Sequence, residues 1–151
     1  MFDPLVLLVE DDPDTREMYA TFLISVGYRV AQAANGVAAL DVARRQCPDI
    51  VITDLAMPLM DGFHLTRELR ARSATRSVPI IAVTGQGVPS TPALACEAGC
   101  CCLFTKPFVP DCLLDAIRSM LDACPHTCMP DAPRRACPAG PPLLDRRSVQ
   151  V

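Results

Sequence analysis

The sequence lacks features that would tie the protein to a membrane, to a secretory route or to nucleic acid. Its longest early aliphatic run, Leu5 to Val9, is far shorter than the ~18 apolar residues of a membrane span. No basic leader precedes this run and acidic residues follow it, so we expect neither a signal peptide nor a membrane partner. The formal charge of −3 shows no basic excess, which disfavours a chain that depends on binding nucleic acid phosphates.

The cysteines and histidines do not form a familiar framework. There are nine cysteines, an odd number, and Cys100, Cys101 and Cys102 are adjacent, so they cannot all find native disulfide partners. We therefore expect a reduced, cytoplasmic protein with these three residues as small strand residues near the core. The two histidines, His64 and His126, are not spaced as a catalytic dyad or a metal pair.

Strand-like and helix-like segments alternate along the first 122 residues. Three short aliphatic runs are typical of central strands buried on both faces, and two further runs complete a set of five: Leu5–Val9, Tyr28–Ala33, Ile50–Thr53, Ile80–Val83 and Cys101–Thr105. The intervening helices begin near first-turn prolines, and two apolar stripes at spacing four are predicted to face the sheet: Met18, Phe22 and Val26, then Leu113, Ile117 and Leu121. This alternation predicts an α/β fold with helices on both faces of a doubly wound, five-stranded parallel sheet.

The pattern stops after Leu121. Six of the fifteen prolines lie in the last 29 residues, with little periodic apolar content. We therefore predict one domain over residues 1–122 and a disordered tail rich in proline and cysteine over residues 123–151. Four tail residues could in principle hold zinc, but their spacing matches no common site and unpaired thiols are the preferred interpretation: Cys124, His126, Cys128 and Cys137.

Charged residues gather where the predicted strands end. In an open α/β sheet the site lies at the carboxyl ends of the strands. The first strand ends in Glu10-Asp11-Asp12 and the third in Asp54, whereas Thr84 and Lys106 end the fourth and fifth. Carboxylates brought this close repel each other unless a cation lies among them, and a hard divalent ion such as Mg²⁺ suits oxygen ligands. A carboxylate beside Mg²⁺, a hydroxyl and an ammonium form a set equipped for phosphoryl transfer.

These motifs, in this order, resemble those of the response-regulator receiver domain. They read Val9-Glu10-Asp11-Asp12-Pro13 with Arg16, then Thr53-Asp54-Leu55-Ala56-Met57-Pro58-Leu59-Met60-Asp61-Gly62, then Val83-Thr84-Gly85 and Thr105-Lys106-Pro107-Phe108. The resemblance covers roughly residues 4 to 122. It implies the flavodoxin-like strand order 2-1-3-4-5.

The resemblance also implies roles for single residues. Asp54 is the expected phospho-acceptor, and Glu10 and Asp11 are the expected acidic pair. Asp11 and Asp54 are expected to bind Mg²⁺ together with the backbone carbonyl of Ala56, with Glu10 in the same metal site. Thr84 and Lys106 are expected to contact the phosphoryl oxygens, and the Lys106-Pro107 peptide bond is expected to be cis.

Partners follow from the same resemblance. The phosphoryl group is expected to come from a histidine kinase or a histidine phosphotransfer protein, and an unknown protein is the expected target. The tail is too short and too rich in proline for a helix-turn-helix, so we expect no direct DNA binding. A stand-alone receiver and a receiver cut from a hybrid kinase both remain open. A homodimer through the fourth helix, fifth strand and fifth helix is also left open. On this surface the side chains that could face outward are Cys112, Asp115 and Arg118.

Some positions depart from the family pattern. The switch aromatic is replaced by Leu103, and Phe104 next to it has the wrong strand parity to substitute. Residues 85–92 lack the charged first helical turn common in relatives, and Val109 replaces a small hydroxyl cap before Pro110, at an expected cost of about 0.5–2 kcal/mol.

Two other functions compete with a phosphorylated receiver, which is not itself expected to be an enzyme beyond phosphorylating and dephosphorylating itself. A Mg²⁺-dependent aspartyl phosphatase of the haloacid-dehalogenase kind would use Asp12-Pro13-Asp14-Thr15, but its threonine comes one residue early and there is no room for a cap. For Asp12 and Asp14, a role at the start of a helix is favoured. A docking module that is never phosphorylated would have little use for the complete acidic set.

Overall fold

The computed structural model describes residues 3–85, 91–106, 110–123 and 145–146. Strands and helices alternate throughout. The strands are β1 (Leu5–Val9), β2 (Arg29–Ala33), β3 (Ile50–Asp54), β4 (Ile80–Thr84), β5 (Cys102–Thr105) and β6 (Asp145–Arg146). The helices are α1 (Pro13–Ser25), α2 (Gly36–Gln46), α3 (Gly62–Ala71), α4 (Thr91–Ala98) and α5 (Pro110–Ala123).

All strands pair in parallel in one sheet, in the order β2-β1-β3-β4-β5-β6. The five predicted strands and their order 2-1-3-4-5 are confirmed. β6 was not predicted: this two-residue strand pairs with β5 at Leu103 and Phe104. The other tail residues, the Lys106-Pro107 bond, Val109 and residues 86–90 lie outside the described residues, so the expectations for them stay predictions.

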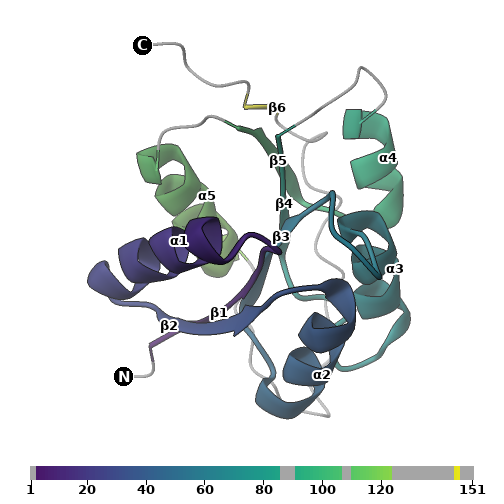
Figure 1. Cartoon of the computed structure of the whole chain (residues 1–151), viewed down its shortest axis with the longest axis horizontal. Coiled ribbons are helices and arrows are strands. Elements are labelled where there is room, and N and C mark those ends of the chain that lie inside the picture. The colour runs from purple at the N-terminus through teal and green to yellow at the C-terminus, as the bar shows by residue number, and fades with distance from the viewer. Residues whose placement is uncertain (1–2, 86–90, 107–109, 124–144, 147–151) are drawn as a thin grey trace.

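The sheet separates two apolar layers. Because side chains alternate along a strand, successive residues enter opposite layers. One layer packs β-strand residues against α1 and α5 and contains Leu23, Phe104 and Ile117. The other packs them against α2, α3 and α4 and contains Leu65, Ala95 and Leu103. Figure 1 shows these two groups of helices on opposite sides of the sheet, which is seen nearly on edge.

Side-chain caps begin three of the helices. Asp12 accepts a hydrogen bond from the Thr15 backbone at 3.0 Å, Asn35 caps α2 and Asp61 caps α3 in the same way. Such caps satisfy amide groups that have no partner in the first helical turn. The helix-start interpretation of Asp12 is therefore confirmed, and Pro13 occupies the first helical position behind it.

The predicted apolar stripe of α1 is wrong at two of its three positions, and only Phe22 packs against the layer below the helix. Met18 is 59% exposed and Val26 is 37% exposed, whereas Ala20 and Leu23 are buried against the sheet. A small residue at position 20 brings this turn of the helix close to the strands, and the larger Met18 then projects away. The stripe predicted for α5 is confirmed, because Leu113 and Ile117 are buried and Leu121 packs against the same layer.

Arg70 ties three segments together at the end of α3. Its guanidinium donates to the carbonyl oxygens of Gly99 at 2.8 Å and of Val78 at 2.6 Å, and it lies 3.5 Å from the Cys101 sulfur. It thus connects α3 with the segment that enters β4 and with the turn between α4 and β5. Cys100 and Cys102 are buried and Cys101 is half-buried, so the predicted place near the core is confirmed, but of the three only Cys102 belongs to a strand.

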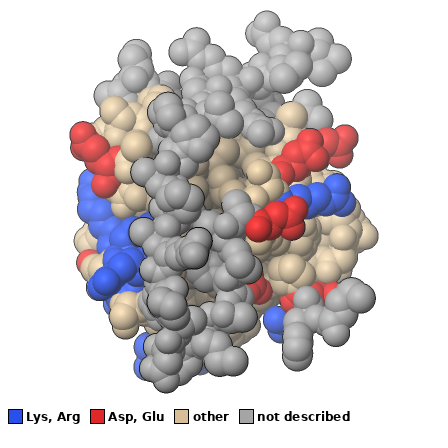
Figure 2. Space-filling model, turned by 180° about the vertical axis from the view of Figure 1, so that it is seen from behind, with Lys and Arg blue, Asp and Glu red and all other residues tan. Residues whose placement is uncertain are grey.

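The exposed surface carries charges of both signs. Figure 2 shows basic side chains gathered toward one side of the rear face and acidic ones mainly toward the other. Asp115 and Arg118 of α5 are exposed as expected, whereas Cys112 is half-buried against the layer below α5. Among the described residues, no helix has both the length and the apolar character needed to span a membrane.

Candidate functional site

Three carboxylates meet at the carboxyl ends of neighbouring strands, as predicted. Glu10 follows β1 and Asp54 ends β3, and β1 and β3 are adjacent in the sheet. One carboxylate oxygen each from Glu10, Asp11 and Asp54 lie within 4.8 Å of one another. Glu10 and Asp54 are buried, with 4% and 8% of their surface exposed, and Asp11 is exposed.

Lys106 brings a positive charge to this cluster from the end of β5. Its ammonium nitrogen lies 3.1 Å from Oε2 of Glu10 and 3.4 Å from Oδ2 of Asp54. Its backbone nitrogen donates to the Thr84 carbonyl at 2.8 Å, which ties β5 to the end of β4. Lys106 is the only lysine in the chain.

The backbone around Asp54 holds one carboxylate oxygen in place. The Ala56 amide donates to Oδ1 of Asp54 at 2.9 Å, which leaves Oδ2 toward Lys106. The loop folds back on the strand, because the Gly62 amide donates to the Leu55 carbonyl at 3.0 Å. A Cβ atom at Gly62 would lie 2.3 Å from the Asp54 carbonyl oxygen, so this close approach requires glycine.

Arg16, which accompanies the first motif of the sequence, makes a contact that was not predicted. Its guanidinium donates to the Glu10 backbone carbonyl at 2.8 Å, and the Asp12 amide donates to the Glu10 carboxylate at 3.3 Å. The start of α1 thereby fixes the turn that follows β1. Only the position of Arg16 one turn into the helix could have indicated this contact.

The electrostatics of the cluster favour the uptake of a cation. Burial raises the pKa of Glu10 to about 7, with the nearby charge of Asp54 adding to the effect and Lys106 opposing it. Burial alone would lower the pKa of Lys106, but its hydrogen bond with Glu10 and the charge of Asp54 raise that pKa above its ordinary value. The single ammonium does not fully neutralise three converging carboxylates. An oxygen-binding divalent ion fits this donor set.

The family is decided by a comparison over most of the chain. The family model of the response regulator receiver domain matches residues 6–118, which run from the second residue of β1 through most of α5 and include every member of the cluster. The chain belongs to the response-regulator receiver domain family. As such it is a module of two-component signalling.

Relatives of this receiver occur in different larger proteins. The receiver is 34% identical to "Response regulator Rre1" of Synechocystis sp. over 80% of its own length and 53% of that protein. It is 35% identical to "Sensor histidine kinase RcsC" of Salmonella typhi over 79% of its length and 12% of that protein. The receiver thus spans about half the length, or less, of these curated relatives.

A solved structure shows the metal chemistry of a similar site. The receiver domain of the sensor histidine kinase PA1611 from Pseudomonas aeruginosa is 34% identical, with a TM-score of 0.74 over 80% of this chain and 99% of that one. It was crystallised with a magnesium ion coordinated in its active site cleft. In the present receiver, the acidic cluster supplies the oxygen donors that such an ion requires.

The two layers of the sheet divide the site of the receiver. Side chains two positions apart on a strand face the same layer. By this rule the layer that faces α1 and α5 is extended by Glu10, Asp54 and Lys106, whereas Thr84 extends the opposite layer. Thr84 is buried at the end of β4. Leu103 and Phe104 face opposite layers, so the predicted difference in strand parity between the two residues is confirmed.

Proposed function

We propose that this receiver accepts a phosphoryl group on Asp54 in a Mg²⁺-dependent reaction and signals by altered protein binding. The observation that carries the proposal is the buried Asp54 carboxylate, which lies within 4.8 Å of Glu10 and Asp11 and 3.4 Å from the Lys106 ammonium. Three carboxylates and one ammonium at the ends of apolar strands are not needed to stabilise the fold, so their convergence indicates a functional role. Strongly perturbed ionisable groups in one place are typical of functional sites.

Glu10, Asp11 and Asp54 are the side chains that would hold Mg²⁺, with the backbone carbonyl of Ala56 as a fourth ligand. When bound, the ion supplies positive charge that stabilises the oxygens of a transferring phosphoryl group. The protein's own contribution is orientation. The Ala56 amide fixes Oδ1 of Asp54, and Arg16 fixes the turn that carries Glu10 and Asp11.

In the proposed transfer, a carboxylate oxygen of Asp54 forms the new P–O bond as the P–N bond to the donor's phosphohistidine breaks. The imidazole leaves, and Asp54 becomes an acyl phosphate. Lys106 is placed to offset charge on the phosphoryl oxygens, and the Thr84 hydroxyl is the proposed second contact. One phosphoryl group per chain is held, and the receiver is therefore not an enzyme that turns over a substrate.

The proposed donor is a histidine kinase or a histidine phosphotransfer protein in the cytoplasm. One relative is itself a sensor histidine kinase and another is a response regulator of which the match covers 53%, so both support a receiver that is part of a longer protein, while a stand-alone receiver stays open. The downstream target is a protein, with no direct contact to DNA. Phosphorylation would act by shifting the population of two conformations toward one that binds this target.

Use of Asp12 as a helix cap disfavours the phosphatase alternative. That alternative needs Asp12 and Asp14 as catalytic acids, yet Asp12 accepts hydrogen bonds from both the backbone and the hydroxyl of Thr15. Asp14 lies exposed in the first turn of α1. Neither carboxylate belongs to the cluster formed by Glu10, Asp11 and Asp54.

Intact-mass spectrometry after incubation with acetyl phosphate and Mg²⁺ tests the proposal. We expect one hydroxylamine-labile phosphoryl adduct on the wild type and none on Asp54→Asn. Asp41→Asn is the matched control, because Asp41 is a surface carboxylate of α2 paired with Arg44 and Arg45 and should leave the adduct intact. Absence of the adduct and of released phosphate, with Mg²⁺ binding confirmed, would contradict phosphorylation and favour a docking module.

A further inference from the structure

Tyr19 is an aromatic residue of α1 that lies next to the proposed site. It follows Arg16 by three residues, so the two side chains share a face of the helix. Tyr19 is half-buried and packs against the layer that contains Phe104, Leu113 and Ile117. Its ring therefore occupies the boundary between the apolar layer and the charged end of the sheet.

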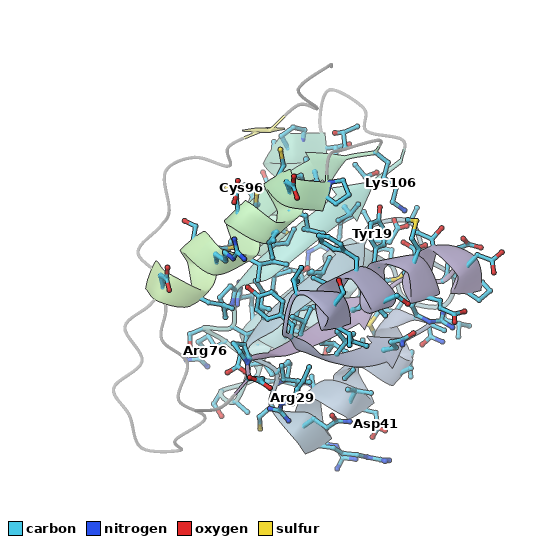
Figure 3. The ribbon with its side chains drawn as sticks, turned by 90° about the vertical axis from the view of Figure 1, so that its left-hand side faces the viewer. Tyr19, Arg29, Asp41, Arg76, Cys96 and Lys106 are labelled. Carbon is cyan, nitrogen blue, oxygen red and sulfur yellow. The ribbon has the colours of Figure 1, made fainter. Side chains whose placement is uncertain are left out.

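Strand alternation brings the charged groups to the same side of the sheet as Tyr19. Each charged residue lies two positions after an apolar residue of the layer that faces α1 and α5: Glu10 after Leu8, Asp54 after Ile52 and Lys106 after Phe104. Residues two positions apart on a strand point to the same side of the sheet. Figure 3 shows Tyr19 and Lys106 close together, toward the end of the sheet opposite to Arg29 and Arg76.

The phenol of Tyr19 interacts electrostatically with these three charged groups. Burial raises the pKa of Tyr19, the charge of Lys106 opposes that rise, and the charges of Glu10 and Asp54 add to it. The interaction is mutual, since Tyr19 also acts on Lys106. Among the described aromatic residues, Tyr19 thus combines a polar atom near the ammonium with a ring in the apolar layer.

We infer that Tyr19 is a positioning residue for Lys106 and that its ring transmits the position of Lys106 to the layer between α1, α5 and the sheet. The inference rests on the proposed function, because it supposes that Lys106 meets a phosphoryl group on Asp54. Lys106 now lies 3.1 Å from Glu10 and 3.4 Å from Asp54. A phosphoryl group would draw the ammonium away from Glu10, and the phenol would follow this displacement.

The composition of the chain makes this inference testable at single residues. Lys106 is the only lysine, so a protein grown with lysine labelled at ¹³Cε gives one lysine signal in a nuclear magnetic resonance spectrum. There are two tyrosines and no tryptophan, so Tyr28→Phe leaves Tyr19 as the only strong intrinsic fluorophore. Tyr28 also packs against the same layer, which makes Tyr28→Phe a matched control.

Tyr19→Phe removes the phenol oxygen and keeps the ring. We expect it to shift the Lys106 signal in the metal-free protein and to slow phosphoryl uptake from acetyl phosphate about tenfold, as misplacement of a reacting group does. The melting temperature should stay within about 2 °C of the wild type, because the apolar ring remains. In Tyr28→Phe, beryllofluoride with Mg²⁺ should change the fluorescence of Tyr19, and the Lys106 signal and the uptake rate should match the wild type.

The inference is overturned if Tyr19→Phe and Tyr28→Phe give the same Lys106 signal and the same uptake rate. It is also overturned if Tyr19 fluorescence does not respond to beryllofluoride that is bound at Asp54. Failure of the wild type to take up a phosphoryl group would refute the proposed function instead. The Lys106 signal of the metal-free protein still reports on the link to Tyr19 in that case, so the two failures are distinguishable.

Discussion

Replacement of Gly62 by alanine should unfold the receiver at a much lower temperature by pushing on the backbone of Asp54. The added Cβ atom would meet the Asp54 carbonyl oxygen at 2.3 Å and the Leu55 Cα at 2.8 Å. Both are backbone atoms of the β3 end, which cannot rotate away as a side chain would. Overpacking usually costs 1–3 kcal/mol, and we expect about 3 kcal/mol here.

The expected loss of stability in Gly62→Ala is informative because helix propensity alone would predict a gain. Alanine in place of glycine near a helix start normally stabilises a protein by about 0.4–1 kcal/mol where the backbone permits it. A loss of about 3 kcal/mol lowers the melting temperature of a domain of this size by about 10–15 °C. Thermal unfolding followed by circular dichroism measures this directly.

Gly85→Ala is the matched control. Gly85 also lies beside the site, but within the described part of the chain the only atom within 4 Å of its added Cβ, chain neighbours aside, would be Lys106 Cδ at 4.0 Å, and its φ lies outside the left-handed region. We expect its melting temperature to stay within about 2 °C of the wild type. A melting temperature of Gly62→Ala equal to that of Gly85→Ala would refute the close approach at the end of β3. If the reasoning holds, Gly62→Ala should also weaken Mg²⁺ binding, since Asp54 moves with its carbonyl.

Three further predictions concern pH, thiols and the half-buried guanidinium of Arg70. The raised pKa of Glu10 means that the metal-free native state holds an extra proton between about pH 4.5 and pH 7, so its stability falls as the pH rises through this range. Mg²⁺ needs the ionised carboxylate, so the rise in melting temperature on adding Mg²⁺ should be larger at pH 8 than at pH 5.5, and Glu10→Gln should remove most of this difference. Burial raises the pKa of the Cys100 thiol to about 11, so iodoacetamide at pH 8 should modify the exposed Cys96 well before Cys100. Equal rates of modification of the two cysteines, measured by peptide mapping, would contradict the burial of Cys100. Arg70→Met should lower the free energy of unfolding in urea by about 2 kcal/mol because the backbone carbonyls of Arg76, Val78 and Gly99 lose a charged donor. Arg67→Met, at an exposed position of the same helix, should change it by less than about 0.5 kcal/mol.

The central strands could be predicted because they are buried on both faces and therefore read as unbroken aliphatic runs. Leu5 to Val9 and Ile80 to Val83 are of this kind. Helix faces were harder to assign. In α1 the apolar residues lie on several sides, and the packing surface is formed around Ala20, whose small side chain gives no signal in a pattern of large apolar residues.

The members of the site could be predicted to the extent that they end strands. Glu10, Asp54 and Lys106 were found by that rule, and the sheet order then brings them together. Contacts that depend on how one element approaches another could not be derived in this way. The bond from Arg16 to the Glu10 carbonyl and the approach of Tyr19 to Lys106 follow from the docking of α1 on the sheet, which strand patterns do not specify.

The single lysine has a practical consequence for handling this protein. Apart from the amino terminus, every reagent that targets amines has one destination in the chain, which is the ammonium between Glu10 and Asp54. Fixing the protein to a biosensor surface or attaching a dye through amine coupling would therefore consume the group under study. Attachment through the exposed thiol of Cys96 on α4 leaves that ammonium untouched, so binding assays with candidate partners are best built on thiol chemistry.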